Sequence, residues 1–339
     1  MLRVERFSGS AAEWDSFASG QIGYTHFHRF GWKRVIEQLL GHRCMYLAAR
    51  DSNERLAGVL PLVRVRSPLF GHYLVSMPFL NYGGPLGTSA AIAALVDEAC
   101  ELARASDVKL LELRSRMQLD LELAVSHRKI TVLLDLPDDA NALFRRIDGK
   151  LRSQIRKPQK AGLTVSFGRD QVRPFFDVFS RHMRDLGSPT HSSAFFQAIA
   201  DAFGDDCWFA CAYAGRIPVA GGCGFRFGDE FEMTWASSLR EYNRDAPNML
   251  LYWSFMQRAI ESGASTFNFG RCTPGGGTHR FKQQWGGRDQ PLWWYGLAKS
   301  ADATVPSHDA SYSWGPRLWR KLPLPIATAL GPSIVRCLP

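Results

Sequence analysis

Hydrophobic residues follow two periodicities along this chain: some segments have the spacing of an amphipathic helix, and others have the alternation of a strand. Residues 36–50 and residues 199–213 each begin as an amphipathic helix ended by a glycine and continue into a strand. A tight polar turn and a second strand follow in both places. The two segments align without a gap, so that Gly41 matches Gly204 and Cys44 matches Cys207. The pattern predicts an internal repeat.

Each copy of this repeat continues with a further helix and a further strand. Residues 90–105 lead into a strand at 109–114, and residues 249–261 lead into a strand at 266–269. This order predicts an α/β (α+β) protein, in which two copies of one unit carry mixed sheets flanked by helices. The predicted organisation has four parts: an N-terminal domain, a basic helical connector, a C-terminal domain and a basic, proline-rich tail, at 1–148, 149–162, 163–300 and 301–339.

The connector belongs to the most basic segment of the chain. Residues 143–173 contain nine Lys or Arg against two acids, within a formal net charge of +9. The helical pattern of the connector places Arg152 and Arg156 on one face. Pro158 is expected to kink or end that helix, because its ring clashes with the preceding turn. The charge favours a phosphate-bearing partner or an anionic surface, and the alternative is a solvated helix face.

Composition limits the class of protein. The 339 residues suffice for two ordinary domains, and a hydrophobic fraction of 45% with a charged fraction of 22% is typical of globular protein. Seven cysteines, an odd number without paired spacing, predict no disulfide framework and fit a reducing compartment. Neither a signal peptide nor an apolar run long enough for a membrane span is recognised. A cytoplasmic protein is expected.

Residues 267–287 form the most informative stretch for chemistry. A short alternating strand runs into a glycine-rich loop, and glycine lets backbone approach a ligand closely. The cations of this stretch and of its edge meet no carboxylate before Asp289: Arg271, Arg280, Lys282 and Arg288. Such a stretch fits an anionic ligand, or negative charge that develops during a reaction. The alternative is an ordinary hairpin with surface cations.

Several common chemistries are excluded by their missing motifs. The sequence contains no GxxxxGK[ST] phosphate loop, no GxGxxG, HExxH or GxSxG, and no paired CxxC. His26 and His28 flank Phe27 at a predicted helix start, and we interpret them as packing or capping residues instead of metal ligands. No metal site is predicted.

Four segments resemble the FemAB family of aminoacyl and peptidyl transferases, which belongs to the GNAT acyltransferase superfamily. They are Asn81-Tyr82-Gly83-Gly84-Pro85-Leu86, Arg152-Ser153-Gln154-Ile155-Arg156-Lys157, Phe269-Gly270-Arg271 and Phe281-Lys282-Gln283-Gln284-Trp285-Gly286. Further segments resemble the branch associated with exosortase/PEP-CTERM exopolysaccharide systems: Arg184-Asp185-Leu186-Gly187-Ser188-Pro189, Trp235-Ala236-Ser237-Ser238, Tyr242-Asn243-Arg244 and Asn248. The resemblance covers residues 1–298.

The resemblance implies two tandem GNAT-like domains, with the reaction centre in the second. It implies transfer of an aminoacyl or acyl group to an amine of a cell-envelope precursor, such as a peptidoglycan or exopolysaccharide intermediate. No permanently bound cofactor is expected, because the acyl donor is a cosubstrate, either aminoacyl-tRNA or acyl-CoA. One departure bears on the donor. The [QR]xxGx[GA] motif with which acyl-CoA enzymes of this fold bind pyrophosphate at a helix start is not found.

The acyl-transfer chemistry that the resemblance implies indicates candidate site residues. Lys282 is expected to stabilise an oxyanion and Arg271 to bind a phosphate, while Tyr242 offers a hydrogen bond and Asp185 could accept a proton or orient an amine. The candidate catalytic residues are thus Lys282, Arg271, Tyr242 and Asp185. The candidate substrate-binding residues are Asn81, Gly83, Gly84, Arg152, Arg156, Trp235, Asn248 and Gly276.

Two other functions stay open, namely a CoA-dependent N-acetyltransferase acting on an amino sugar and a non-catalytic protein that binds a polyanionic glycan precursor. The expected partners are a phosphorylated or lipid-linked glycan precursor and tRNA. In the tail, Trp314, Leu318 and Trp319 alternate with basic residues, and no acid follows Asp309. The tail either touches the anionic inner face of the cytoplasmic membrane or packs back onto the second domain.

Overall fold

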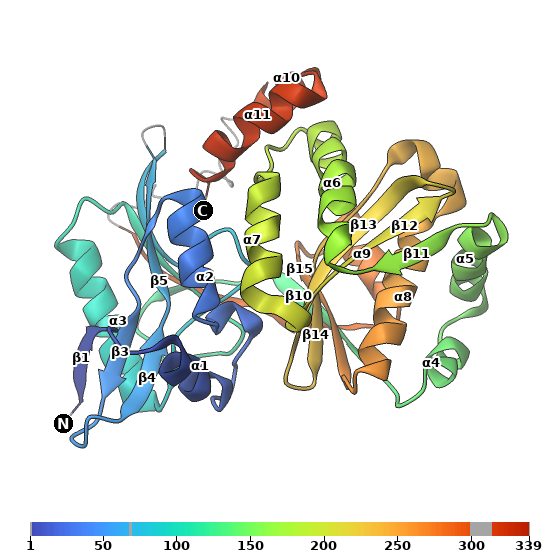
Figure 1. The fold of residues 1–339 in the computed structure, drawn as a ribbon. Helices are drawn as coiled ribbons and strands as arrows, with labels where there is room; N and C mark the ends of the chain where they lie inside the picture. The colour runs from blue at the N-terminus through green and yellow to red at the C-terminus, as the bar shows by residue number, and fades with distance from the viewer. Residues whose placement is uncertain (1, 68–69, 299–313, 339) are drawn as a thin grey trace. The chain divides into compact units, whose positions relative to one another are not determined.

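The computed structural model describes residues 2–67, 70–298 and 314–338, which group into two compact units (Figure 1). The first unit holds the described residues up to Arg128, from Pro291 to Ala298, and from Ser333 onward. The second holds Lys129–Gln290 and the tail up to Pro332. The start of the tail predicted at 301–339, up to residue 313, lies outside the described residues. No helix in the described part of the chain is long and apolar enough to cross a membrane.

The first unit contains two sheets, whose strand orders are β1-β3-β4-β7 and β2-β5-β6-β8-β17-β9. Two of its helices start at side-chain caps: the hydroxyls of Ser10 and Thr88 accept backbone N–H groups at the starts of α1 and α3. The strands are β1 Arg3–Arg6, β2 Arg43–Cys44, β3 Leu47–Arg50, β4 Leu56–Leu60, β5 Leu62–Ser67, β6 Gly71–Ser76, β7 Leu86–Gly87, β8 Leu110–Ser115, β9 Ala124–Ser126 and β17 Trp293–Ala298, and the α-helices are α1 Ala11–Ser19, α2 Gly31–Val35 and α3 Ser89–Arg104.

The second unit is built on one seven-stranded sheet of order β11-β12-β13-β14-β15-β10-β16. Its strands are β10 Ile130–Asp135, β11 Thr164–Phe167, β12 Cys207–Ala214, β13 Ile217–Phe227, β14 Glu230–Ser238, β15 Thr266–Cys272 and β16 Arg288–Pro291. Its α-helices are α4 Ala140–Arg146, α5 Gly149–Lys160, α6 Val172–Leu186, α7 Ser193–Phe203, α8 Pro247–Glu261 and α9 Gly277–Gln283. Two tail helices follow, α10 Trp314–Trp319 and α11 Leu324–Val335. The fold is the mixed α/β architecture that the repeat predicts.

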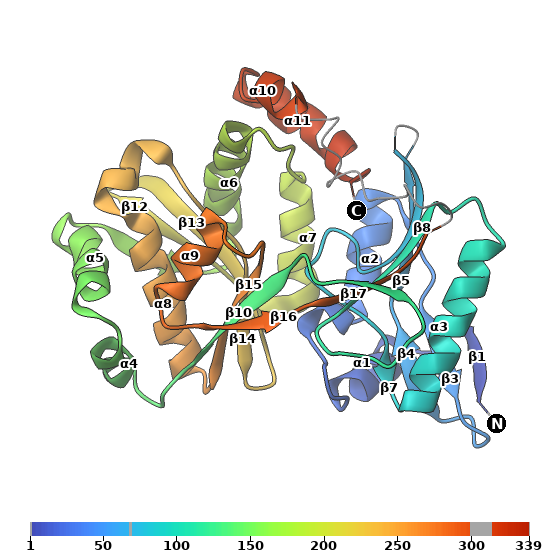
Figure 2. The same cartoon turned by 180° about the vertical axis from the view of Figure 1, so that it is seen from behind.

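Each unit is completed by a strand from the opposite half of the sequence. β10 follows the first unit along the chain but pairs antiparallel with β15, and it lies beside β15 and β16 in Figure 2. β17 comes near the end of the chain and pairs with β8 and β9 of the first unit. The units therefore do not follow the chain as the segments 1–148 and 163–300 do.

Two glycines of β13 explain how helices cover both faces of the second sheet. A Cβ atom on Gly221 would lie 3.2 Å from the Cα of Phe175 in α6, and one on Gly222 would lie 2.9 Å from the ring of Phe255 in α8. α6 and α8 thus pack on opposite faces, and each needs a glycine beneath it. Close packing of the two helices therefore explains why glycine occupies positions 221 and 222.

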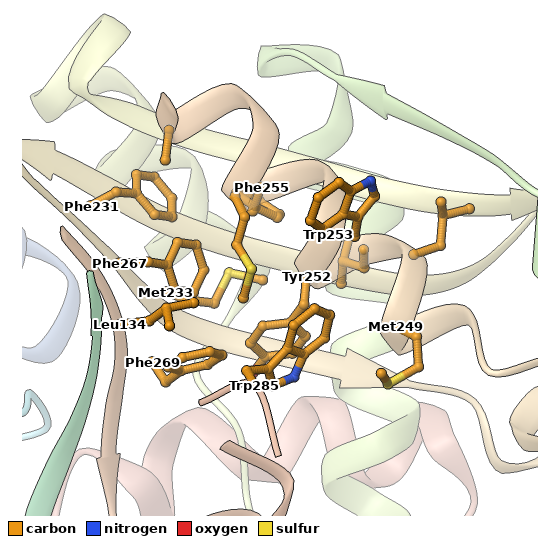
Figure 3. Close-up of a cluster of buried hydrophobic side chains, with 14 of the residues drawn as sticks. Leu134, Phe231, Met233, Met249, Tyr252, Trp253, Phe255, Phe267, Phe269 and Trp285 are labelled. Atoms are coloured by element: carbon orange, nitrogen blue, oxygen red, sulfur yellow. The ribbon is translucent and has the colours of Figure 1, made fainter. Parts of the chain in front are cut away.

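The face under α8 holds an aromatic core, drawn in Figure 3. Phe231, Phe267 and Phe269 of β14 and β15 project toward Tyr252 of α8 and toward Trp285 beyond α9. Trp285 is 1% exposed. Burial of these large aromatic side chains stabilises the packing of α8 on β14 and β15. The ends of the two strands are therefore held in place by this core.

The expectation that Pro158 ends the connector helix is wrong. α5 begins at the cap Asp148, whose carboxylate accepts from the Leu151 N–H at 2.8 Å, and runs on to Lys160. Leu151, Ile155 and Pro158 are its buried residues. The proline removes one backbone hydrogen bond, but its ring adds to the buried stripe and only two residues follow it in the helix.

Candidate active site

The site is built where two neighbouring strands separate. β14 and β15 pair in parallel over only three positions, Glu230 to Glu232 with Thr266 to Asn268. Beyond Glu232, β14 stays paired with β13, whereas β15 stays paired with β10. The sheet is therefore split at this end between its two halves.

Asn268 and Gly270 account for the change in the path of β15. The Oδ1 atom of the fully buried Asn268 accepts from the Gly270 N–H at 2.8 Å and from the Thr131 hydroxyl at 2.5 Å. Its amide donates to Glu230 at 2.7 Å. Gly270 has φ +71°, which is costly for any other residue, and the β10 register shifts opposite it, between Thr131 and Leu133. This bulge turns β15 away from β14.

A cavity of about 280 Å³ lies at the end of β14. Its lining comes from both faces of the sheet, with α6 on one side and α8 and α9 on the other. The lining residues are His182, Ala236, Ser237, Ser238, Asn248, Leu251, Tyr252, Gly277, Thr278 and Phe281. The Ser237 hydroxyl is buried and has no hydrogen-bond partner in the described part of the chain. The hydrogen-bonding capacity of this hydroxyl is therefore unmet within the described part of the chain.

Lys282 lies on α9 and is 3% exposed, so it is neither in a hairpin nor on the surface. Its Nζ donates to the carbonyl oxygens of Gly270 at 2.6 Å and Arg271 at 3.0 Å. Burial lowers the pKa of Lys282 to about 8, against smaller effects of Cys272 and Glu232 that raise it. The ammonium ties α9 to the end of β15, and the side chain is not part of the cavity lining.

The glycine-rich loop before α9 is held by a histidine. His279 Nδ1 accepts from the Gly275 N–H at 2.9 Å, and its Nε2 donates to the carboxylate of Asp289 at 2.9 Å. Gly275 has φ +75°, and Gly276 is the N-cap of α9. The contact fixes the loop that presents Gly277 and Thr278 to the cavity.

Comparison with known proteins agrees with this architecture. Residues 145–283 match the family model described as the acetyltransferase (GNAT) domain. This part of the chain is similar to a GNAT domain. The split strands and the cavity lie within the matched residues or at their edge. No curated protein matches the sequence.

Solved structures show the same fold over most of the chain. The crystal structure of FemX is 16% identical, with a TM-score of 0.65 over 86% of this chain and 97% of that one. The C-terminal DUF2156 domain of a putative lysylphosphatidylglycerol synthetase from Agrobacterium fabrum is 14% identical, with a TM-score of 0.59 over 89% and 96%. A tandem GNAT protein from the clavulanic acid biosynthesis pathway is 11% identical, with a TM-score of 0.55 over 89% and 100%. The predicted tandem GNAT fold is confirmed.

Several predicted residues lie at or near this cavity. Asn248 lines it, and Gly276 directly precedes the lining residue Gly277. Tyr242, in the 3-10 turn η5 at Arg240–Asp245, packs against the aromatic core. Asp185 pairs with Arg184 at 2.7 Å, three residues after His182 on α6.

Other predicted residues lie elsewhere. Arg271 is at the end of β15, where its carbonyl accepts from Lys282, and Trp235 packs edge-on against Phe196 of α7. Arg152 and Arg156 are on α5 and do not line the cavity.

Asn81, Gly83 and Gly84 belong to the first unit, in the segment between β6 and β7. There His28 Nε2 donates to the Gly84 carbonyl at 3.0 Å, and His28 Nδ1 accepts from the Thr25 N–H at 3.1 Å. These contacts confirm the packing and capping role expected for this histidine.

Sequence reasoning missed the residues on which the cavity most depends. His182, Ser237 and Tyr252 line it, and Asn268 shapes the split beside it. The Phe-Asn-Phe-Gly order of β15 carried a usable signal, because a glycine two residues after an asparagine within a strand favours a bulge. His182 follows no recognisable motif.

Proposed function

We propose that the second unit transfers an aminoacyl or acyl group to an amine of a cell-envelope or exopolysaccharide precursor. The observation that carries this proposal is the cavity at the strand split of a GNAT domain, lined by hydroxyl, amide and imidazole groups from both faces of the sheet. β14 beyond Glu232 has no ladder pairing on the β15 side among the described strands, so an extended donor could pair with it as an added strand.

The donor is proposed to be a cosubstrate, aminoacyl-tRNA or acyl-CoA, and not a resident cofactor. α8 begins beside the cavity, where a phosphate-bearing donor would meet helix N–H groups. Pro247 occupies its first position and supplies no N–H, and its N-cap Ala246 offers no side-chain cap. The start of α8 thus supplies no side-chain replacement for the missing acyl-CoA motif. Aminoacyl-tRNA is therefore the preferred donor.

The test offers both donor classes to the full chain. Radiolabelled acetyl-CoA and a labelled aminoacyl-tRNA mixture are each incubated with lipid-linked and nucleotide-linked amino-sugar precursors. We expect label in the precursor, lost when Ser238→Phe fills the cavity and retained in Ser153→Phe on the exposed side of α5. Label from acetyl-CoA alone would favour the N-acetyltransferase alternative. Precursor binding without transfer from either donor would favour a non-catalytic binding protein.

Arg152 and Arg156 are proposed to bind phosphate on donor or acceptor. Arg152 donates to the Arg145 carbonyl at 3.3 Å, and the Arg156 guanidinium lies 5.1 Å from the centre of the Phe144 ring. Both cations are thereby ordered next to further exposed cations. The double alanine variant should lose about 1.5–3 kcal/mol of binding for each charged contact, raising KM and weakening its salt dependence.

The matched control for this variant removes the same charge elsewhere. Arg169 and Arg173 pair with Asp201 and Asp177. Their double alanine variant should leave KM within about twofold, since these cations are already neutralised. Equal effects of the two double variants would make the α5 cations a solvated surface.

The tail is proposed to touch an anionic membrane surface while resting on the second unit. Arg184 donates to the Leu322 carbonyl at 3.2 Å, and Arg320 donates to the Leu186 carbonyl at 3.1 Å. The apolar side chains of Leu318, Ile326 and Leu330 nevertheless stay 58%, 46% and 49% exposed. The side chain of Trp314 lies outside the described residues. Exposed apolar groups next to Arg317 and Lys321 suit the boundary of an anionic bilayer.

Liposome co-sedimentation tests this surface. The triple variant Leu318→Glu, Ile326→Glu, Leu330→Glu should lose binding to vesicles containing one-third phosphatidylglycerol. Ile217→Glu alters a side chain that is 52% exposed on β13, and it should bind as wild type does. Unchanged binding of the triple variant would show that the tail does not make the membrane contact.

A further inference from the structure

His182 borders the cavity from α6, on the sheet face opposite to α8. Its Nδ1 lies 3.1 Å from the carbonyl oxygen of Ser238, at the end of β14. A carbonyl oxygen can only accept, so Nδ1 carries the proton of the neutral ring and Nε2 keeps its lone pair. Nε2 has no hydrogen-bond partner among the residues that the structure describes. The ring is fixed at one nitrogen, and its basic nitrogen is left for a ligand.

We propose that His182 is the catalytic proton acceptor of the transfer reaction, receiving the proton of the attacking amine at Nε2. This inference rests on the proposed function and adds a base that no motif of the sequence reveals. Among the residues that line the cavity, only His182 and Tyr252 titrate. Burial raises the pKa of Tyr252, so its phenol stays protonated and can donate but not accept a proton.

The proton balance of the step closes without any further reactant. The amine nitrogen attacks the carbonyl carbon of the donor, and the new C–N bond forms as the carbonyl π electrons move to oxygen. The proton released from nitrogen goes to His182 Nε2. When the tetrahedral intermediate collapses, the bond from carbon to the leaving oxygen or sulfur breaks, and His182 returns the proton to that atom. The histidine ends neutral, ready for another cycle.

The surroundings of His182 keep it neutral near pH 7. Burial is the main cause that lowers its pKa below the ordinary 6.5, and Arg240 lowers it further, while the Ser238 hydrogen bond and Asp185 act in the opposite direction. Two further charges on α6 and η5, Arg181 and Glu241, pair with each other at 3.2 Å, and Arg184 of α6 pairs with Asp185 at 2.7 Å. The lining residues from β14, α8 and α9 carry no charge. The imidazole is thus unprotonated and available.

The neighbouring Ser237 hydroxyl, which is buried and unpartnered within the described chain, gives the cavity a second polar group. Because such a group is costly to bury alone, a ligand atom that bonds to it restores the lost hydrogen bond. Ser237 and His182 both belong to the lining of this cavity.

Two substitutions separate a base from a structural contact. His182→Asn places an amide N–H where Nδ1–H was and can keep the bond to Ser238, but it has no basic nitrogen. His182→Gln places an amide near the position of Nε2 and loses that bond. For a proton acceptor, both variants should lower kcat by about 10²–10⁴-fold, with KM changed less than threefold, and both should abolish the fall in rate at acid pH. The exposed His127→Asn is the matched control and should change neither.

A chemical probe tests the same nitrogen without any substrate. Diethyl pyrocarbonate acylates an accessible, unprotonated imidazole, so mass spectrometry should find label on His182 and on the control His127. His191, which is buried against Phe195, should stay unlabelled. Labelling of His182 should persist at pH 6, because its pKa is lowered.

Each outcome is decisive. Absent labelling of His182, or normal kcat in His182→Asn, would overturn the proposal. If His182 is labelled but neither donor class gives transfer in wild type, the proposed function fails and not the assignment of a basic, accessible imidazole.

Discussion

Replacing Lys282 with alanine is expected to lower both turnover and the free energy of unfolding. The sequence alone predicts a variant that folds normally, but the side chain is 3% exposed and its ammonium serves two backbone carbonyls. Alanine removes the packed stem and leaves the Gly270 and Arg271 carbonyls unpaired. A loss of about 2–5 kcal/mol in the free energy of unfolding is expected, measured by urea denaturation.

Lys282→Met separates packing from charge. Methionine keeps most of the stem, so its stability should lie between alanine and wild type. If the ammonium stabilises charge in the transition state, both variants lose about 10²–10³-fold in kcat. If Lys282→Met retains more than a third of the wild-type kcat, the lysine acts only by holding α9 against β15.

The pKa of Lys282 adds a pH signature to this comparison. It is lowered to about 8 by burial, whereas the unfolded chain has the ordinary value of 10.5. Between these two values the unfolded state binds the proton more tightly, so the contribution of this group to stability rises with pH, by about 3 kcal/mol in total. Below pH 8 both states hold the proton and the slope vanishes. Wild type should therefore gain stability relative to Lys282→Met from pH 8 to pH 10.

The local hydrophobic pattern predicted where helices and strands lie better than it predicted which strands pair with each other. The helices near 90–105 and 249–261 carry long apolar stripes, and the structure has them as α3 and α8. Strand pattern alone does not say which sheet a strand joins. β10 pairs with β15 of the second unit, and β17 pairs with β8 of the first unit. These partners are distant in sequence, so the local hydrophobic pattern does not predict the pairings.

The candidate site shows the same division. A glycine-rich loop with a lysine bracketed by aromatics was visible in the sequence, but whether Lys282 faces a ligand or the protein depends on the helix that forms around it. The sequence predicts that the Lys282 ammonium reaches a ligand, whereas in the structure the side chain is buried and its ammonium donates to the Gly270 carbonyl of β15. The sequence gives no sign of the role of His182, because its hydrogen-bond partner Ser238 is 56 residues away. The two residues meet only in the fold, where α6 packs against the end of β14.

Asn268 is expected to be the most sensitive position of the strand split. Its side chain accepts from Thr131 and Gly270 and donates to Glu230, all in buried or part-buried surroundings. Asn268→Ala leaves these groups unpaired and should lower the free energy of unfolding by about 3–6 kcal/mol, measured by urea denaturation. A loss below about 1 kcal/mol would mean that water or neighbouring groups replace the bonds and that the network does not hold the bulge.

Asn268→Asp keeps the shape of the side chain but replaces its donor with a carboxylate beside Glu230 and Glu232. Like charges should raise the folded-state pKa of the new carboxyl above its unfolded value. The folded state then binds the extra proton more tightly, so the stability of the variant relative to wild type is greatest below the unfolded value and falls as pH rises through the folded value. Asn243→Asp, on the exposed surface of η5, should show no such slope between pH 5 and pH 7.5. If Asn268→Asp is as stable as wild type at pH 7.5, the amide is not what directs β15. If Asn268→Asp is less stable than wild type at pH 7.5 and its stability rises toward pH 5, the buried amide donor of Asn268 maintains the divergence of β14 and β15. The cavity depends on that divergence.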